Sequence, residues 1–353
     1  MKKTIIVSAL ILFVCISCKK STKSDLEPLV ISMVPTHVSI FGASDGSVDL
    51  TVTGGDSPFQ YQWSNGETTE DISNLTAGIY LVTVTDSDIQ TIIDSVKINQ
   101  PTSPLQGRDY NFYIPSSYTG DNAVPLVIAL HPRGSNGNNF EFLTGFSQLA
   151  QNEKFIVVYP NATGEPSQWN EGLGHTPSTL DINDVEFIST LIDEFIINYN
   201  IDTNRVYITG FSTGSLMAHL LAVKLSTKIT AIGAVAVHPT NPILNMFPPA
   251  KPISILHFYM LDDQSVSYNG GTLNNVSYPP VEDAIAAWVN ANNCQTQPTI
   301  ILDEGEVYAR QWMSNDSNID VVLYRINTGG HNWLSSPISM TEIIWEYFEN
   351  HSR

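Results

Sequence analysis

Residues 210–214 read Gly-Phe-Ser-Thr-Gly, and the sequence on either side makes Ser212 a candidate nucleophile. The β-branched and aromatic run at residues 205–210 predicts a short buried strand, and the apolar run that starts at Ser215 predicts a helix. A strand, a tight G-x-S-x-G turn and a helix together lift a serine hydroxyl out of a sheet. The glycines let strand and helix approach closely, and the N–H groups at the helix start can stabilise an oxyanion. The alternative is a glycine-lined turn without chemistry.

A serine nucleophile needs a base, an acid that orients the base, and oxyanion donors. His331 has the position expected of the base, because it follows Thr-Gly-Gly at residues 328–330, directly beyond a predicted strand at residues 321–326. The glycines allow the loop to bring the imidazole ring near Ser212. The other candidates fit less well: His219 lies within the helix after Ser212, His238 and His257 lie on or at the end of strands, where they could support the site, and His351 lies at the tail.

Two adjacent carboxylates are candidates for the acid. Asp262 and Asp263 both follow another predicted strand, residues 253–259, which gives the chain order Ser, Asp, His that is typical of an α/β-hydrolase site. Either residue could instead cap the following turn, a common role of aspartate in loops. Spacing alone does not choose between them.

Predicted strands alternate with predicted helices from residue 108 onward. Several of the strands are continuous apolar runs, as expected for a parallel sheet that helices cover on both faces. We therefore expect a doubly wound, mostly parallel α/β domain whose site lies at the carboxyl ends of the strands. The predicted strands are residues 110–114, 125–130, 155–159, 206–209, 231–237, 253–259 and 321–326, and the predicted helices are residues 140–152, 184–199, 215–226, 281–292 and 340–350.

The overall charge restricts the class of partner. The 353 residues include 16 Lys and Arg against 35 Asp and Glu, a net charge of −19, which argues against nucleic acid and other polyanionic partners. The length suffices for one large domain and one smaller domain. The residues singled out for chemistry imply no metal and no organic cofactor.

The first 18 residues are typical of an export signal. Lys2 and Lys3 precede an apolar run at residues 5–16 that is too short to span a bilayer. The ending Cys-Ile-Ser-Cys resembles a bacterial lipobox, which implies a lipid on Cys18 that anchors the protein to the outer membrane or cell surface. Residues 19–28 would then be a tether. The alternative is secretion without a lipid. If Cys15 leaves with the signal and Cys18 carries the lipid, only Cys294 of the three cysteines remains, so we expect no internal disulfide.

Residues 29–101 have a different pattern, with short alternating runs between turn signals. This pattern predicts a small all-β sandwich of about seven strands, with Trp63 as its buried central aromatic or, alternatively, as an exposed binding residue. The segment resembles a repeat of surface adhesins of gliding bacteria. The resemblance lies in residues 46–55, 61–66, 69–80 and 82–86.

Cysteines that are common in those adhesin repeats are absent here, so no disulfide is carried over. No residue of the segment suggests chemistry, which leaves a spacer or a weak surface-binding or carbohydrate-binding module. A proline-bearing linker, residues 102–107, follows.

The domain from residue 108 to residue 353 resembles the secreted esterases grouped with polyhydroxybutyrate depolymerases and feruloyl esterases. The resemblance implies an α/β-hydrolase fold and ester hydrolysis. It also places the catalytic acid five residues before the Tyr of a Tyr-Asn-Gly-Gly segment. Counted back from Tyr268, that residue is Asp263, with Asp262 as the second choice. The matching segments are residues 125–131, 155–160, 168–172, 184–188, 201–212, 266–271, 288–294 and 329–333.

Several departures from the family pattern concern the substrate cleft. Pro132 follows His131 where the family usually has His-Gly. Because proline has no N–H, the oxyanion donor of this loop would be Arg133 or a later residue, with the Thr213 N–H as the second donor. The family's Trp-Pro-Gly after the catalytic histidine is Trp-Leu-Ser at residues 333–335. Ester hydrolysis is still expected, but the family's substrates do not transfer directly.

These inferences combine into one hypothesis, an exported serine ester hydrolase. Ser212 attacks an ester carbonyl, His331 carries the proton, and Asp263 holds the His331 tautomer. Trp169 and Trp333 are candidates for the wall of the acyl or sugar site, with buried core aromatics as the alternative. Candidate substrates are feruloyl or acetyl esters on plant polysaccharide and short hydroxyalkanoate polyesters. The competing hypothesis is a surface-binding protein with a catalytically degenerate hydrolase fold.

Overall fold

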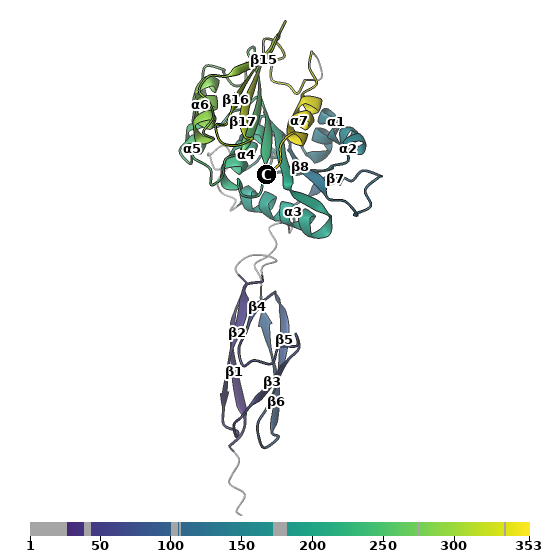
Figure 1. Cartoon of the computed structure of the whole chain (residues 1–353), viewed down its shortest axis with the longest axis vertical. Helices are drawn as coiled ribbons and strands as arrows, with labels where there is room; N and C mark the ends of the chain where they lie inside the picture. Colours follow the sequence, from purple (N-terminus) through teal and green to yellow (C-terminus); the bar gives the residue numbers. More distant parts are fainter. Residues whose placement is uncertain are drawn as a thin grey trace, which may run out of the picture. The chain divides into compact units, whose positions relative to one another are not determined.

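The computed structural model describes residues 27–38, 44–99, 105, 107–171, 182–273, 276–334 and 337–353 (Figure 1). The chain divides into two compact units, Met1–Thr102 and Ser103–Arg353. The predicted signal peptide, Cys18 and nearly all of the predicted tether lie outside the described residues, as do most residues of the predicted linker. Within the described ranges, no helix has the length and apolarity that a membrane span requires.

The first unit is an antiparallel β-sandwich, as predicted, and its described part has six strands rather than about seven. Alternate residues of the strands point inward to one core. Trp63 lies at the centre of this core, 1% exposed, and its indole N–H donates to the Thr69 carbonyl at 2.9 Å. The buried alternative for Trp63 is therefore the one observed. One sheet has the order β1 (Val30–Thr36), β2 (Gly46–Thr53), β4 (Ile72–Leu75), and the other β3 (Gln60–Trp63), β5 (Gly78–Thr85), β6 (Thr91–Ile98).

The second unit is built on a nine-stranded sheet in the order β15-β16-β17-β12-β11-β10-β8-β9-β7. The six central strands, β17-β12-β11-β10-β8-β9, pair in parallel, whereas β7, β15 and β16 pair antiparallel. The parallel strands correspond to the apolar runs of the sequence and are buried almost throughout. The strands are β7 (Tyr110–Tyr113), β8 (Val124–Leu130), β9 (Ile156–Pro160), β10 (Ile201–Phe211), β11 (Ala231–Val235), β12 (Ser254–Met260), β15 (Thr299–Glu304), β16 (Val307–Met313) and β17 (Asp320–Ile326).

Helices cover both faces of this sheet, each over its own buried core. One core contains residues of α3, α4 and α6, and the other contains residues of α1, α2 and α7. Cys294 is a free, buried thiol in the first of these cores. The helices are α1 (Gly137–Thr144), α2 (Phe146–Glu153), α3 (Asp184–Asn198), α4 (Thr213–Lys224), α5 (Asn241–Leu244), α6 (Val281–Ala291) and α7 (Met340–Glu349), with a hairpin of β13 (Gly271–Leu273) and β14 (Val276–Tyr278) before α6.

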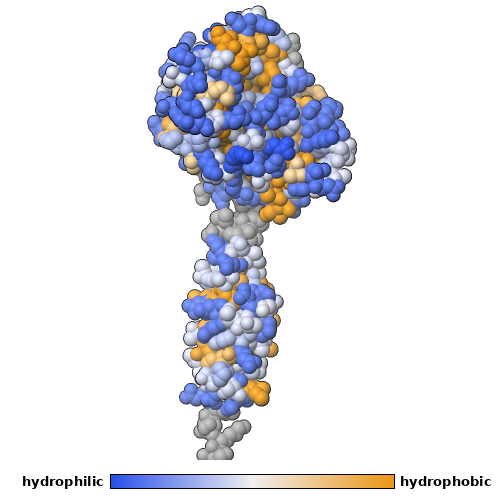
Figure 2. Space-filling view, viewed as in Figure 1, coloured by the Kyte–Doolittle hydropathy of each residue, from blue (hydrophilic) through white to orange (hydrophobic). Residues whose placement is uncertain are grey.

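Several features of the hydrolase unit differ from the prediction, including α5 and the β13–β14 hairpin, neither of which was predicted. The single helix expected at residues 140–152 is two helices, because Gly145 adopts φ 66° and ends α1 with its N–H on the Glu141 carbonyl. The strands β15 and β16 were not predicted. β15 is an edge strand with Ile300 and Ile301 exposed to 56% and 43%, so its sequence has no clean inward–outward alternation. On the face of the larger unit drawn in Figure 2, hydrophobic residues gather in patches between polar ones, and one patch lies at the top of the view.

The strand order defines where a ligand site should form. From β8 the chain moves to β9 on one side, and it later crosses to β10 on the other side and continues to β11 and β12. The point between β8 and β10, at their carboxyl ends, is therefore a topological switch point, where open α/β sheets bind ligands. The loop that follows β8 and the turn that follows β10 meet there.

Candidate active site

Ser212 stands on the turn between β10 and α4 in a strained backbone conformation. Its φ is 55° and its ψ is −118°, a region that residues with a side chain rarely adopt and that often marks a functional site. A Cβ on Gly210 would lie 2.3 Å from the Gly214 carbonyl oxygen, and a Cβ on Gly214 would lie 2.1 Å from the Leu130 carbonyl oxygen. Both glycines are therefore required by close backbone contacts, which fix the turn between β8, β10 and α4.

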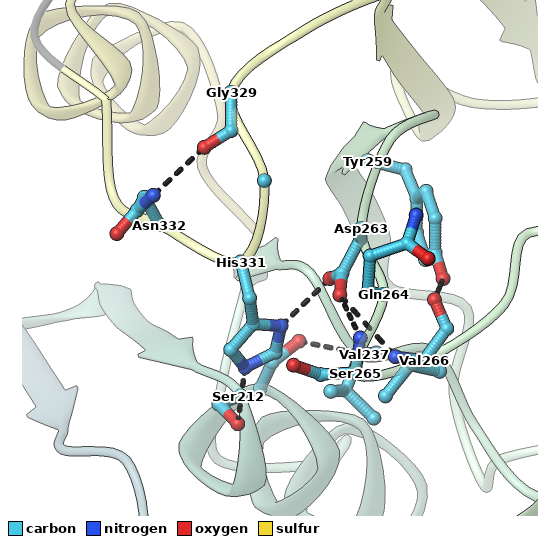
Figure 3. Close-up of polar contacts among 12 residues, drawn as sticks. Ser212, Val237, Tyr259, Asp263, Gln264, Ser265, Val266, Gly329, His331 and Asn332 are labelled. Carbon is cyan, nitrogen blue, oxygen red and sulfur yellow. Dashed lines mark hydrogen bonds and ion pairs between the residues drawn. The ribbon is translucent and has the colours of Figure 1, made fainter.

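Three side chains form a continuous chain of hydrogen bonds at this turn (Figure 3). His331 Nδ1 lies 2.6 Å from Asp263 Oδ2, and His331 Nε2 lies 2.8 Å from Ser212 Oγ. An ionised carboxylate only accepts hydrogen bonds, so Nδ1 carries the proton and Nε2 offers its lone pair to the Ser212 hydroxyl. The structure thus brings together the predicted nucleophile, acid and base, which in that order are 51 and 68 residues apart along the chain.

The environment of Asp263 keeps it ionised. Its Oδ1 accepts the N–H groups of Ser265 and Val266 at 2.7 and 3.2 Å. Burial raises the pKa of Asp263, but the hydrogen bond from His331, those two backbone N–H groups and the charge of His331 together hold the pKa below its ordinary value. Asp263 can therefore stabilise a positive charge on His331.

Asp262 makes a different set of contacts. Its side chain is exposed, and its Oδ1 and Oδ2 accept the N–H groups of Gly330 and Gly329 at 2.7 and 3.2 Å. These glycines adopt φ 62° and 144° and immediately precede His331. Asp262 is thus a residue that positions the histidine loop, whereas Asp263 contacts the imidazole itself.

The loop after β8, residues 131–135 (the β8 loop), is held by side-chain hydrogen bonds. His131 Nε2 accepts the Ala162 N–H at 2.9 Å, so its Nδ1 carries the proton and donates to the Pro132 carbonyl at 2.8 Å. Trp169 Nε1–H donates to the His131 carbonyl at 2.8 Å. The histidine and the tryptophan therefore fix the path of the backbone through Pro132.

The backbone N–H groups that follow Pro132 in the β8 loop differ in whether they donate a hydrogen bond within the protein. Gly134 N–H donates to the Ser167 carbonyl at 2.8 Å and Ser135 N–H donates to the Pro132 carbonyl at 3.2 Å. Arg133 is the residue after Pro132 whose N–H has no protein acceptor among the described residues. Arg133 and Thr213 both line a cavity together with Ser212 and His331.

That cavity has a volume of about 190 Å³ and opens at the switch point between β8 and β10. Most of the exposed surface of its wall is apolar, although only four of its fourteen lining residues are aliphatic. The lining residues are Arg133, Gln168, Glu171, Ser212, Thr213, Leu216, Val237, His238, Thr240, Ser265, Val266, Val276, Tyr278 and His331. Such a combination of apolar wall and convergent polar groups is typical of a small-molecule site.

Comparisons with known proteins agree with the fold of this unit. Residues 108–240 match the family model described as Esterase PHB depolymerase, and residues 37–68 match the SprB repeat. The solved structure of an acetyl xylan esterase from Aspergillus awamori aligns with a TM-score of 0.50 at 14% identity, over 68% of this chain and 93% of that one. The larger unit has the α/β-hydrolase fold. The resemblances inferred from the sequence, to these esterases and to the adhesin repeat, are confirmed.

Curated relatives of the hydrolase unit share part of their length with this chain. Feruloyl esterase B of Piromyces equi is 29% identical over 226 residues, which are 62% of this chain and 41% of the relative. The bifunctional acetylxylan esterase/xylanase XynS20E of Neocallimastix patriciarum is 30% identical over 165 residues, 46% of this chain and 22% of the relative. The chain thus spans less than half the length of either protein.

The two tryptophans proposed for the substrate wall lie in the core of the hydrolase unit instead, which corrects that prediction. Trp169 is fully buried and its indole N–H is bound to the His131 carbonyl. Trp333 is 8% exposed and packs edge-on against Phe140 and Phe146, with its N–H on Thr341 Oγ1 at 2.9 Å. Neither lines the cavity, because both indoles are packed into the buried cores on the two faces of the sheet.

The other histidines lie apart from the Ser212–His331–Asp263 chain. His219 and His257 are fully buried and contact each other at 3.3 Å between Nε2 and Nδ1. Burial lowers the pKa of His219 to about 3 and that of His257 well below its ordinary value, so both are neutral at neutral pH. His351 Nε2 pairs with Asp320 Oδ1 at 3.1 Å, and neither residue lines the cavity.

His238 is the site residue whose importance the sequence did not indicate clearly. It follows the predicted strand at residues 231–237 and lines the cavity directly, whereas the sequence suggested only a supporting role. The expectation that the site lies at the carboxyl ends of the strands was the signal that could have singled it out.

Proposed function

We propose that this protein is an exported serine carboxylic-ester hydrolase that works through an acyl-enzyme. The observation that carries the proposal is the hydrogen-bonded chain from Asp263 through His331 to Ser212 Oγ, at 2.6 and 2.8 Å, on a strained turn that opens into a cavity. The similarity of the chain to feruloyl and acetylxylan esterases supports it.

The reaction follows from the tautomer of His331. Ser212 Oγ attacks the ester carbonyl while His331 Nε2 takes its proton, and the Asp263 carboxylate stabilises the imidazolium that forms. The N–H groups of Thr213 and Arg133 bind the oxyanion of the tetrahedral intermediate. His331 then returns the proton to the leaving alcohol, and water, activated by the same imidazole, releases the acid from Ser212. No step requires a metal or a cofactor.

The place of action is part of the proposal. A lipid on Cys18 would hold the enzyme at the outer membrane or cell surface, and secretion after cleavage is the alternative. The β-sandwich unit would serve as a spacer or a weak surface-binding module. The ester is carried by a small molecule or by a polymer, with feruloyl or acetyl polysaccharide esters and short hydroxyalkanoate polyesters as candidates. Nucleic acid is not an expected partner at a net charge of −19.

Hydrolysis of p-nitrophenyl acetate by residues 28–353 tests the enzymatic proposal, with Ser212→Ala as the matched control. We expect the substitution to remove essentially all turnover above the uncatalysed rate, because the nucleophile is lost. Equal rates for the two proteins would favour the competing hypothesis of a binding protein with a degenerate hydrolase fold. For the anchor, Cys18→Ala in the full chain should move the protein from the membrane fraction to the soluble fraction of the producing cell.

A further inference from the structure

The cavity beside Ser212 is lined by a residue with a hydrogen-bond acceptor, His238 Nδ1, that no group in the described part of the chain uses. We propose that His238 is a specificity-determining residue, whose Nδ1 accepts a hydrogen bond from a hydroxyl group on the acyl part of the ester. This inference rests on the proposed ester hydrolysis and specifies which esters the same site prefers.

The volume of the cavity limits what can enter it. It measures about 190 Å³, and an interior cavity of about 150 Å³ is large enough to bind benzene. The cavity therefore holds one aromatic ring with a short extension, or a short aliphatic chain. Any polymer to which the ester belongs must remain outside.

The wall of the cavity combines apolar surface with buried polar atoms. Three side-chain atoms of its lining residues, Thr213 Oγ1, His238 Nδ1 and Thr240 Oγ1, are buried and have no protein partner within the described part of the chain. Buried polar atoms nearly always have a partner, because leaving one unpaired is costly. Because the three residues line the cavity, a ligand bound there can supply the partners. The apolar part of the wall is formed by Leu216, Val237, Val266 and Val276.

The tautomer of His238 determines the kind of partner. Its Nε2 lies 2.7 Å from the Pro279 carbonyl oxygen, and because a carbonyl only accepts, Nε2 carries the proton and Nδ1 offers a lone pair. Burial lowers the pKa of His238 to about 4, so the ring keeps this neutral form at neutral pH. The buried rings of His238 and His257 have their centres 6.4 Å apart, and no hydrogen bond joins the two side chains.

Only a donor can therefore satisfy His238. The hydroxyl groups of Thr213 and Thr240 can rotate to donate or accept, so they distinguish ligands less sharply. A hydroxyl on the acyl group meets the requirement of Nδ1, whereas a methyl, carbonyl or ether group in the same place leaves it unpaired. Among the candidate substrates, hydroxyaryl and hydroxyalkanoyl esters carry such a donor, and an acetyl ester does not.

Matched pairs of methyl esters provide the test, because methanol is too small to fill the cavity and only the acyl group can do so. One pair is methyl 4-hydroxycinnamate and methyl cinnamate, and the other is methyl 3-hydroxybutyrate and methyl butyrate. For the unaltered protein we expect kcat/KM to be at least about tenfold higher for the hydroxylated member of one pair. The pair that responds identifies the acyl class as hydroxyaryl or hydroxyalkanoyl.

The variant His238→Phe keeps a ring of similar size but removes Nδ1, and it should bring that ratio close to one. His219→Phe is the matched control, because His219 is as deeply buried as His238 but does not line the cavity. This variant should keep the kcat/KM ratio of the unaltered protein.

The inference would be overturned if the unaltered protein showed Ser212-dependent turnover but equal kcat/KM for the two members of each pair. This outcome does not depend on whether the variant folds. A preference that survives in folded His238→Phe would overturn it as well. Absence of any Ser212-dependent turnover would instead overturn the proposed function, and this inference would fall with it.

Discussion

The Ser212 turn and the β8 loop both line the cavity, but different physical means hold them in place. At the turn, Gly210 and Gly214 permit backbone contacts that no side chain could share. In the β8 loop, by contrast, the backbone is held by side chains, namely the ring of His131 within the loop and the indole N–H of Trp169 outside it. A backbone-fixed turn needs particular residues at particular positions, whereas a loop fixed by side chains tolerates an unusual residue such as Pro132.

The strongest test of the backbone-fixed turn is Gly214→Ala. The added Cβ would lie 2.1 Å from the Leu130 carbonyl oxygen, which is main chain and cannot rotate away. We expect a loss of at least about 3 kcal/mol in the free energy of unfolding together with loss of esterase activity, because overpacking against a rigid backbone is costly. Urea unfolding of the hydrolase unit measures this change. Ala218→Gly in the same helix is the control, and it should cost only about 1 kcal/mol.

Near-wild-type stability of Gly214→Ala would mean that β8 and α4 can separate without strain. The contrast between the Ser212 turn and the β8 loop would then be wrong, since both would tolerate substitution.

The next largest effect should come from the neighbouring acids, Asp263 and Asp262. Asp263→Asn removes the charge that stabilises the His331 imidazolium and disturbs its tautomer, so kcat should fall by about 10³–10⁴-fold. Asp262→Asn weakens the support of the Gly329 and Gly330 N–H groups, and it should lower kcat by about tenfold or less. Comparing kcat of the two variants on one ester is the measurement. Equal losses would contradict the separate roles assigned to the two carboxylates.

The Ser212 turn was predictable from the sequence because its constraints are local. The glycines, the serine and the flanking apolar runs lie within about 20 residues, and the predicted parallel strands were found. The choice between Asp262 and Asp263 was not available from spacing, since both follow β12. It depends on which carboxylate the chain turns toward His331, and that is set by the Ser265 and Val266 N–H groups that hold Asp263 Oδ1.

Other features depended on packing between distant segments. Trp169 and Trp333 have the residue type of a substrate wall, but their neighbours in the fold bury them. The hairpin of β15 and β16 escaped prediction because an edge strand such as β15, with apolar residues exposed, lacks the usual alternation. The end of α1 at Gly145 was marked by a glycine, yet glycine within a helical pattern does not always end a helix.

A smaller effect is expected where side chains hold the β8 loop. Trp169→Phe keeps most of the buried ring but removes the hydrogen bond to the His131 carbonyl. We expect the free energy of unfolding to fall by about 1–3 kcal/mol. We also expect kcat to fall by about tenfold with little change in KM, since the Arg133 N–H would lose its alignment with the oxyanion.

Trp63→Phe is the control for this change, because it removes a similar indole hydrogen bond, to the Thr69 carbonyl, in the β-sandwich unit. It should destabilise that unit and leave kcat unchanged. An unaltered kcat in Trp169→Phe would show that the β8 loop keeps its geometry without this bond.

The smallest effect, and the most direct test of the β8 loop, is expected for Pro132→Gly, which restores the residue usual in the resembling esterases. If Arg133 supplies the oxyanion N–H, the new N–H at residue 132 is not needed, and kcat should change by less than about threefold on p-nitrophenyl acetate. Stability should fall by about 1 kcal/mol, because glycine gives the unfolded chain more freedom than proline. A rise in kcat of about tenfold or more, the order expected of an added oxyanion donor, would mean that Arg133 does not serve the oxyanion and that Pro132 limits catalysis. The β8 loop would then be an incomplete oxyanion site rather than an alternative way of building one.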